Sequence, residues 1–116
     1  SGHIQEVDDT PGAERLHKYH RSGTFEEIHP DGKQVIKIVG DKYEVVLKDD
    51  NLHVKGKLNI TVEGDTSIYS KGNCTAQVDG DMEQIVGGDL TLNAGGEVKI
   101  TAGSNVTVQG NSIRLN

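Results

Sequence analysis

The feature that most constrains the fold is a glycine that returns every eighth residue. Of the eight multiples of eight between 40 and 96, seven are glycine and the eighth is Lys48. With 15 glycines in 116 residues, this coincidence has a chance probability on the order of 10⁻⁵, so the chain contains an eight-residue structural repeat. The predicted corners of the repeat are Gly56, Gly64, Gly72, Gly80, Gly88 and Gly96.

Between the glycines, apolar side chains alternate with polar ones. Of the 18 non-glycine residues at even positions from Leu58 to Ala102, 15 are apolar, whereas the odd positions are mostly polar. A period of two predicts β-strands, because successive side chains of a strand point to opposite faces. Each octad is therefore predicted to be a short strand that ends at a corner. There, glycine is expected to supply a positive φ, and aspartates such as Asp65 and Asp81 to cap the free amides.

The composition leaves two alternatives: either the chain is disordered, or its apolar face is covered by other copies of the chain. Only 33% of the residues are apolar and 3% aromatic, which is too little for one chain to offset about 1 to 2 kcal/mol of ordering cost per residue. A single-chain β-helix usually needs longer coils and a fuller core. We therefore expect an all-β fold: an intertwined homotrimeric β-helix, a triangular prism of octapeptide repeats, preceded by irregular short β-strands.

Because eight is even, the inward phase is kept across every corner. The predicted trimer core consists of the apolar residues on this phase: Leu58, Ile60, Val62, Ile68, Cys74, Ala76, Val78, Met82, Val86, Leu90, Leu92, Ala94, Val98, Ile100, Ala102, Val106 and Val108. Cys74 is expected to be an inert, small buried side chain. The polar residues Thr66, Ser70 and Gln84 share this phase and need partners, such as trapped water. They are compatible with an axial ion or water chain, which we leave unassigned; no cofactor is predicted.

Two regions are predicted. Upstream, the alternation and the turn signals "DDTPGAE", "RSG" and "HPDG" predict short strands at 4–7, 15–20, 24–28 and 33–39. Tyr43, Val45 and Leu47 then alternate on the odd phase, and the turn at 48–51 is expected to reset it. The leader is therefore placed at 1–51, and the octapeptide shaft with its tip at 52–116.

The end of the chain is expected to differ geometrically from the shaft. After Gly96 the glycines move to 103 and 110, and the last apolar residues, Ile113 and Leu115, lie on the odd phase. In a trimer these residues would leave an apolar triangle and open strand edges at a blunt end. Because such edges invite pairing, a cap is expected to bind there.

Charge and length exclude several classes of function. The net charge of −6 and the absence of a basic patch argue against a nucleic-acid partner. No apolar run approaches the ~18 residues of a membrane span, and the first residues do not read as a secretion signal. One cysteine permits no intrachain disulfide.

The leader and the octads together resemble the central spike protein of contractile-tailed phage baseplates and its relative, the VgrG spike of type VI secretion. The "VxG" beat appears at 54–56, 62–64, 78–80 and 86–88. The stretch "HIQEVDDTPGAERLHKYHRSGTFEEIHPDG" looks like the segment that joins that family's oligosaccharide-binding-fold domain to its needle. The likeness covers almost the whole chain.

This resemblance implies a structural, membrane-piercing spike in the virion's tail baseplate, assembled in the host cytoplasm and driven through the host cell envelope on sheath contraction. The expected partners are two further copies, the baseplate hub or tail tube at the N-terminal end, and a PAAR-type tip protein on Ile113 and Leu115. Some members carry a lysozyme domain upstream. Nothing in these residues matches one, so the chain is not expected to be an enzyme.

Two other readings stay open. A β-helical tail-fibre adhesin would bind host surface glycans through exposed aromatic platforms, for which Tyr69 is the only candidate in the shaft. A polysaccharide-cleaving β-helix would need paired carboxylates, but the acidic residues lie on the outward phase and read as a solvated face; they are Glu63, Asp65, Asp79, Asp81, Glu83 and Asp89. No metal site is predicted, because the default for the histidines is to be hydrogen-bonded or exposed; they are His3, His17, His20, His29 and His53.

Overall fold

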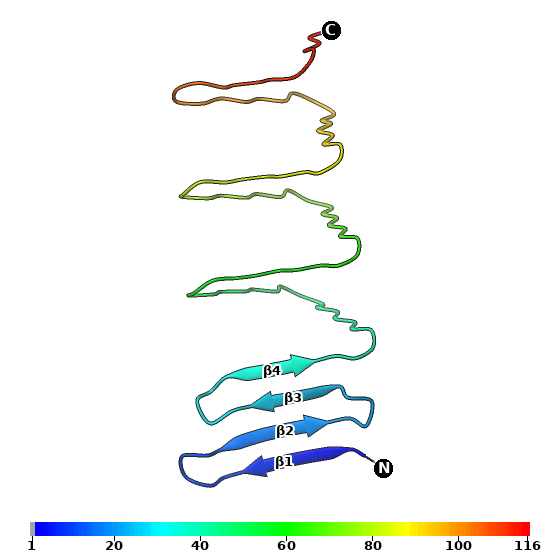
Figure 1. The fold of residues 1–116 in the computed structure, drawn as a ribbon, viewed down its shortest axis with the longest axis vertical. Helices are drawn as coiled ribbons and strands as arrows, with labels where there is room; N and C mark the ends of the chain where they lie inside the picture. The colour runs from blue at the N-terminus through cyan, green and yellow to red at the C-terminus, as the bar shows by residue number, and fades with distance from the viewer. Residues whose placement is uncertain (1) are drawn as a thin grey trace. The chain divides into compact units, whose positions relative to one another are not determined.

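The computed structural model of the chain describes residues 2–116. It divides into two units, Ser1–Thr61 and Val62–Asn116, which are described separately. The first unit begins with an antiparallel sheet in the order β1-β2-β3-β4 (Figure 1). Its strands are β1 (Ile4–Asp8), β2 (Arg15–Tyr19), β3 (Phe25–Ile28) and β4 (Gln34–Lys37). The predicted leader strands are confirmed to within two residues at each end.

Two of the hairpins are built in the same way. The β2–β3 loop holds Arg21, Ser22 and Gly23, and the β3–β4 loop holds Pro30, Asp31 and Gly32. In each loop the glycine has a positive φ, +100° at Gly23 and +86° at Gly32. Each glycine also donates its backbone N–H, at 2.9 Å, to the carbonyl of the residue before the loop. A three-residue loop that ends in a left-handed glycine is a common hairpin connection, so "RSG" and "PDG" set the register of the sheet.

The β1–β2 connection is closed by a carboxylate. Asp8 Oδ1 accepts hydrogen bonds from the backbone N–H of Thr10 at 3.0 Å and from its hydroxyl at 2.7 Å. The Thr10 carbonyl in turn accepts the Ala13 N–H at 2.9 Å, and Gly12 has a φ of +81°. These bonds lower the pKa of Asp8, with the Thr10 hydroxyl as the largest cause. The "DDTPG" turn predicted from the sequence is thus held by its own side chains.

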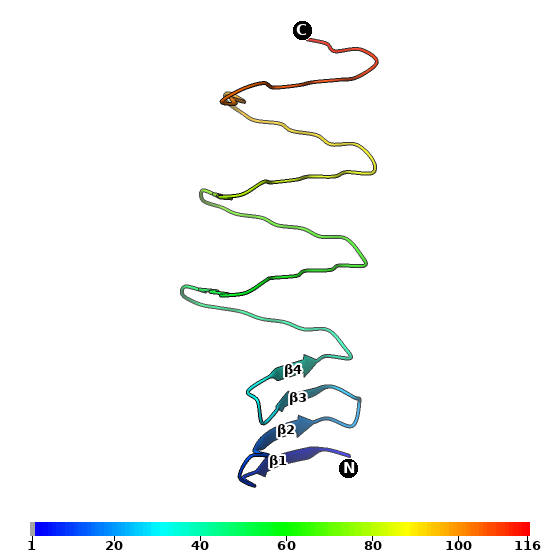
Figure 2. The same ribbon diagram turned by 60° about the vertical axis from the view of Figure 1, so that its left-hand side comes forward.

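After Lys37 the chain is extended and bends at regular intervals. Bends lie at 39–40, 47–48, 55–56, 63–64, 71–72, 79–80, 87–88, 95–96, 103–104 and 111. In the second unit, 62–116, Figures 1 and 2 show nearly straight stretches joined at these bends. The eight-residue period is therefore a property of the backbone as well as of the sequence.

The bends correct two expectations about the repeat. They keep the same beat through Leu47–Lys48, so the backbone phase is not reset at 48–51. They also keep it at 103–104 and 111, so the spacing of the bends does not change near the end of the chain, although the side-chain pattern does. The division into regions at 51/52 stays a prediction.

The expected conformation of the repeat glycines is wrong. Positive φ values among the described glycines occur at 2, 12, 23 and 32, and at none of the predicted corners. The aspartate caps are absent as well, because the aspartates that accept backbone amides within residues 2–116 are Asp8 and Asp31. The bends are thus made in ordinary backbone conformations, and glycine with a positive φ is confined to the leader, at residues 2, 12, 23 and 32.

No hydrophobic core exists in the isolated chain. No described residue is buried, and residues 38–116 make no backbone–backbone hydrogen bond within the chain. The accessible surface is 12,269 Å², against about 6,200 Å² for a folded monomer of this mass and about 18,000 Å² for an unfolded one. The all-β class is confirmed, since the described residues contain strands and no helix; in particular, no helix there has the length and apolar character needed to cross a membrane.

Candidate functional site

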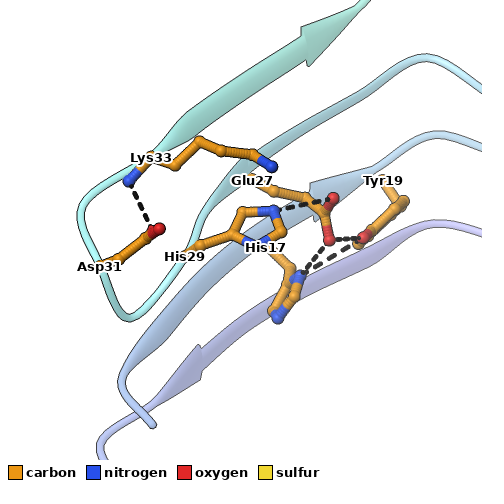
Figure 3. Close-up of polar contacts among 6 residues, drawn as sticks. All are labelled: His17, Tyr19, Glu27, His29, Asp31 and Lys33. Carbon is orange, nitrogen blue, oxygen red and sulfur yellow. Dashed lines mark hydrogen bonds and ion pairs between the residues drawn. The ribbon is translucent and has the colours of Figure 1, made fainter. Parts of the chain in front are cut away.

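A polar cluster lies on one face of the leader sheet, formed by His17 and Tyr19 of β2 with Glu27 of β3 and His29 just beyond it (Figure 3). The antiparallel register sets His17 opposite Glu27 and Tyr19 opposite Phe25. Because directly opposite residues of an antiparallel pair share a face, as do alternate residues of one strand, the "HKY" and "EEIH" sequences bring these polar groups together. Their side chains are largely covered, with exposed fractions of 12% for His17 and 17% for Glu27.

Glu27 is the common acceptor of the cluster. Its Oε2 accepts a hydrogen bond from the Tyr19 hydroxyl and lies 3.1 Å from His17 Nδ1. Its Oε1 lies 3.5 Å from His29 Nε2, a nitrogen that is shielded from solvent and has no hydrogen-bond partner. The Tyr19 ring also contacts the rings of His17 and Phe25, with centroids 5.7 Å and 5.2 Å apart. One carboxylate thus links the two central strands.

The hydrogen bond between Tyr19 and Glu27 shifts the pKa of both side chains. The Tyr19 hydroxyl stabilises the carboxylate and lowers the pKa of Glu27, and the His17 hydrogen bond acts in the same direction. The same bond raises the pKa of Tyr19, because removing its proton would set two negative charges side by side. The hydrogen bond therefore joins an ionised Glu27 carboxylate to a neutral Tyr19 hydroxyl.

The arrangement braces the sheet by linking β2 to β3. Within residues 2–116 no group of three His, Cys, Asp or Glu side chains is placed to hold a metal ion. The carboxylates proposed as a solvated face, Glu63 to Asp89, lie in exposed extended segments. The thiol of Cys74 is free and exposed in the isolated chain.

The predicted core residues lie on one phase of the bent, extended segments. On the even phase, large apolar residues from 46 to 108 are 42% to 78% exposed, except Ile68 at 89%. On the odd phase from 43 to 85 they are 81% to 92% exposed. The two phases are thus physically distinct even in a single chain. The assignment of the even phase to a trimer core stays a prediction.

The repeat glycines lie at bends of the backbone, whereas the roles predicted for the other residues stay predictions. The glycines from Gly56 to Gly96 each lie in a bend. Ser70 donates its hydroxyl to the Gly72 carbonyl at 3.2 Å, which partly satisfies one polar residue of the even phase. At the end of the chain, Ile113 and Leu115 are 54% and 89% exposed. Their binding of a cap remains a prediction.

Two features were missed by sequence reasoning. The Glu27 cluster could have been found by pairing the strands across "RSG", which sets His17 opposite Glu27. The second is the octad 41–48: with no backbone reset, its apolar residues Tyr43, Val45 and Leu47 lie on the phase that is polar elsewhere. Extending the eight-residue period through Lys48 would have shown that these apolar residues lie on the odd phase.

The chain is similar to two curated phage proteins. It is 69% identical over 61 residues to Protein Gp5 of Vibrio phage KVP40 (isolate Vibrio parahaemolyticus/Japan/Matsuzaki/1991), a match that covers 53% of this chain. It is 48% identical over 56 residues to Pre-baseplate central spike protein Gp5 of Enterobacteria phage T4, which covers 48% of this chain. The matches span 14% and 10% of the length of those relatives. No protein-family model matches the chain. The predicted resemblance to phage central spike proteins is confirmed, but these matches cover about half of the chain and not almost all of it.

Proposed function

We propose that this chain is the needle part of a central spike in the tail baseplate of a phage virion, and that three copies wind into an intertwined β-helix that pierces the host cell envelope. The name of the T4 relative supports the spike and its baseplate location, and the KVP40 relative shares its designation Gp5. Because the matches span 14% and 10% of those proteins, the piercing action, the trimer and the partners are our inferences for this chain.

The observation that carries the proposal is an extended chain with a regular beat and no core of its own. Its surface exceeds that of a folded monomer of equal mass by about 6,000 Å². Its extended segments after Lys37 make no backbone–backbone hydrogen bond within the chain. Unpaired backbone and exposed apolar side chains are both covered when strands of other copies lie alongside. Surfaces of several thousand Å² are typical of obligate assemblies.

Three copies fit the eight-residue step. A bend every eight residues lets each copy lay one strand on a face before it crosses to the next, and the even phase then faces inward throughout. The odd phase carries the charges, which keep a long β surface soluble. The result is a rod suited to carry axial force, with structural work rather than catalysis as its role.

The partners follow from the two ends. The baseplate hub or tail tube would hold the N-terminal end. A PAAR-type tip protein would cover Ile113 and Leu115, which are exposed in the isolated chain. The adhesin reading is less well supported, because Tyr69 is the only aromatic residue between 44 and 116.

Sedimentation equilibrium of the purified chain tests the assembly. We expect a mass near three times 12.5 kDa, about 37.5 kDa; a compact, folded species of one chain would refute the proposal. The assembled protein, tethered at its N-terminus to a force probe, should then break a supported bilayer at a lower force than the bare probe. Binding on a glycan array would favour the adhesin, and release of reducing sugar would favour an enzyme.

A further inference from the structure

The even phase, which is assigned to the proposed core, carries charged residues in one short stretch. Between 40 and 112 these residues are Lys42, Glu44, Lys48 and Asp50, which we call the charged belt. From 52 to 112 every residue on this phase is uncharged. The belt has two positive and two negative side chains, so its net charge is zero. A balanced set of this kind can be neutralised by ion pairs inside an assembly.

The backbone places the charged belt on the same phase as the apolar residues that follow it. Bends at 39–40 and 47–48 keep the eight-residue spacing through the belt. Val46, on the even phase, is 46% exposed, whereas Tyr43 and Val45, on the odd phase, are 87% and 81% exposed. The even side of this octad is therefore its more covered side, as it is in the later octads.

Lys42 and Glu44 form an ion pair inside one copy. Lys42 Nζ lies 3.1 Å from Glu44 Oε2, because side chains two positions apart lie on the same side of an extended chain. The two side chains remain 60% and 59% exposed. Since an ammonium group has three donors and a carboxylate has several acceptor sites, each group can also bind its counterpart in a neighbouring copy.

An octapeptide repeat leaves the register of three wound copies poorly specified. A slip by one residue exchanges the two faces of a strand and is strongly disfavoured. A slip by eight residues, in contrast, sets apolar residues beside apolar residues and a bend beside a bend. The backbone pairing of the leader does not remove this ambiguity, because β1 to β4 pair with one another inside one copy.

We propose that the charged belt fixes the register of the three copies, through ion pairs between Lys42 of one copy and Glu44 of the next. The inference rests on the proposed assembly, which supplies the neighbouring copies. A slip by one octad would break these pairs, because the residues one octad away from Glu44 are the uncharged Ile36 and Leu52. Breaking an ion pair in a covered site is costly, and polar core residues of coiled coils specify register in the same way.

The single methionine of the chain, Met82, reports the register. When three copies share one register they are equivalent, so an isotopically labelled Met82 methyl group gives one NMR signal. A belt-free variant receives the residue types of the later octads at all four belt positions. Its substitutions are Lys42→Leu, Glu44→Leu, Lys48→Gly and Asp50→Leu. We expect this variant to remain trimeric but to give several Met82 signals, because slipped copies are not equivalent.

A control variant changes charges on the odd phase instead. Lys55→Gln combined with Glu63→Gln removes one positive and one negative charge and leaves the belt intact. It should give one Met82 signal, as the unchanged chain should. Several signals from this control would show that the register does not depend on the belt in particular.

Refolding of mixed copies tests whether the ion pairs join different copies. Lys42→Glu makes positions 42 and 44 both negative, and Glu44→Lys makes both positive. Refolded together, these two variants should form mixed assemblies more often than random in native mass spectra, because opposite charges then meet between copies. Lys55→Glu and Glu63→Lys change the net charge by the same amounts on the odd phase and should mix at random.

The mass of the unchanged chain is measured first, so that failures of the two proposals are told apart. A trimer whose belt-free variant gives one Met82 signal, or whose Lys42→Glu and Glu44→Lys copies mix at random, would refute the role of the belt and leave the assembly standing. Several Met82 signals from the unchanged trimer would also refute that role. A monomer would refute both proposals.

Discussion

At the scale of single residues, Glu27 is the best-defined polar group of the chain. It receives hydrogen bonds from two side chains of β2 and lies 3.5 Å from His29. Since a charged acceptor strengthens its hydrogen bonds, the ionised carboxylate binds β2 to β3 at a point where the sheet has no hydrophobic core beneath it.

Acid should loosen the leader sheet through Glu27. The folded-state pKa of Glu27 is lowered from its ordinary value of 4.5, so its contribution to stability is present above that value and is lost as the pH falls through the folded pKa. Thermal melts should show that the unchanged chain has a higher melting temperature than Glu27→Gln at pH 6, and that this difference shrinks as the pH falls to 3. A difference that is independent of pH would contradict this, and Glu63→Gln serves as the control.

Removing the Tyr19 hydroxyl should raise the pKa of Glu27. The Tyr19 hydrogen bond is the largest cause of the lowered value, so Tyr19→Phe should move the Glu27 titration toward higher pH. A carbon-detected NMR titration of the carboxylates measures it. Tyr69→Phe, which changes a tyrosine outside the cluster, should leave the Glu27 curve in place; no movement in Tyr19→Phe would show that the bond does not form in solution.

At the scale of elements, glycine has two different roles. In the leader hairpins, Gly23 and Gly32 adopt positive φ values, which other residues adopt only at a cost. In the repeat, glycines from Gly56 to Gly96 have no positive φ, and a Cβ added to any of them meets no atom within 4 Å. Nothing inside the chain therefore requires glycine at the bends, which points to a close approach by neighbouring copies.

Alanine substitutions should separate these two roles. Gly32→Ala should destabilise the leader by about 1 kcal/mol because of its left-handed backbone. Gly72→Ala should weaken the assembly, because a methyl group would meet a neighbouring copy. Both are measured by denaturant unfolding of the assembled protein. If Gly72→Ala is instead stabilising, as expected where only the entropy of the unfolded chain changes, no neighbour approaches the bend.

At the scale of the whole molecule, folding and association are expected to be one event. Residues 38–116 have neither backbone pairing nor a core within the chain, so a separated copy has little to hold it in shape. An assembly of this kind has no stable folded monomer, and its stability depends on protein concentration.

The melting temperature should therefore rise with protein concentration when unfolding is reversible. Scanning calorimetry over a hundredfold concentration range measures this. Where unfolding is irreversible, the expected signature is a half-life that falls steeply on heating. A reversible transition at the same temperature across the range would indicate that each copy folds alone.

The sequence alone determined the strands of the leader, the all-β class, the eight-residue beat and the phase of the apolar residues, because local alternation and turn residues depend on near neighbours. It did not determine the pairing of His17 with Glu27, since this depends on the register across a hairpin. It also misassigned the glycine conformation, because a bend can be made in more than one way. Only the tertiary structure decided that the bends are made without left-handed glycine and that the backbone also bends at Leu47–Lys48, where the sequence has no glycine. The bends set the backbone phase independently of the side chains, and so placed Tyr43, Val45 and Leu47 on the odd phase, which is mostly polar in the later octads.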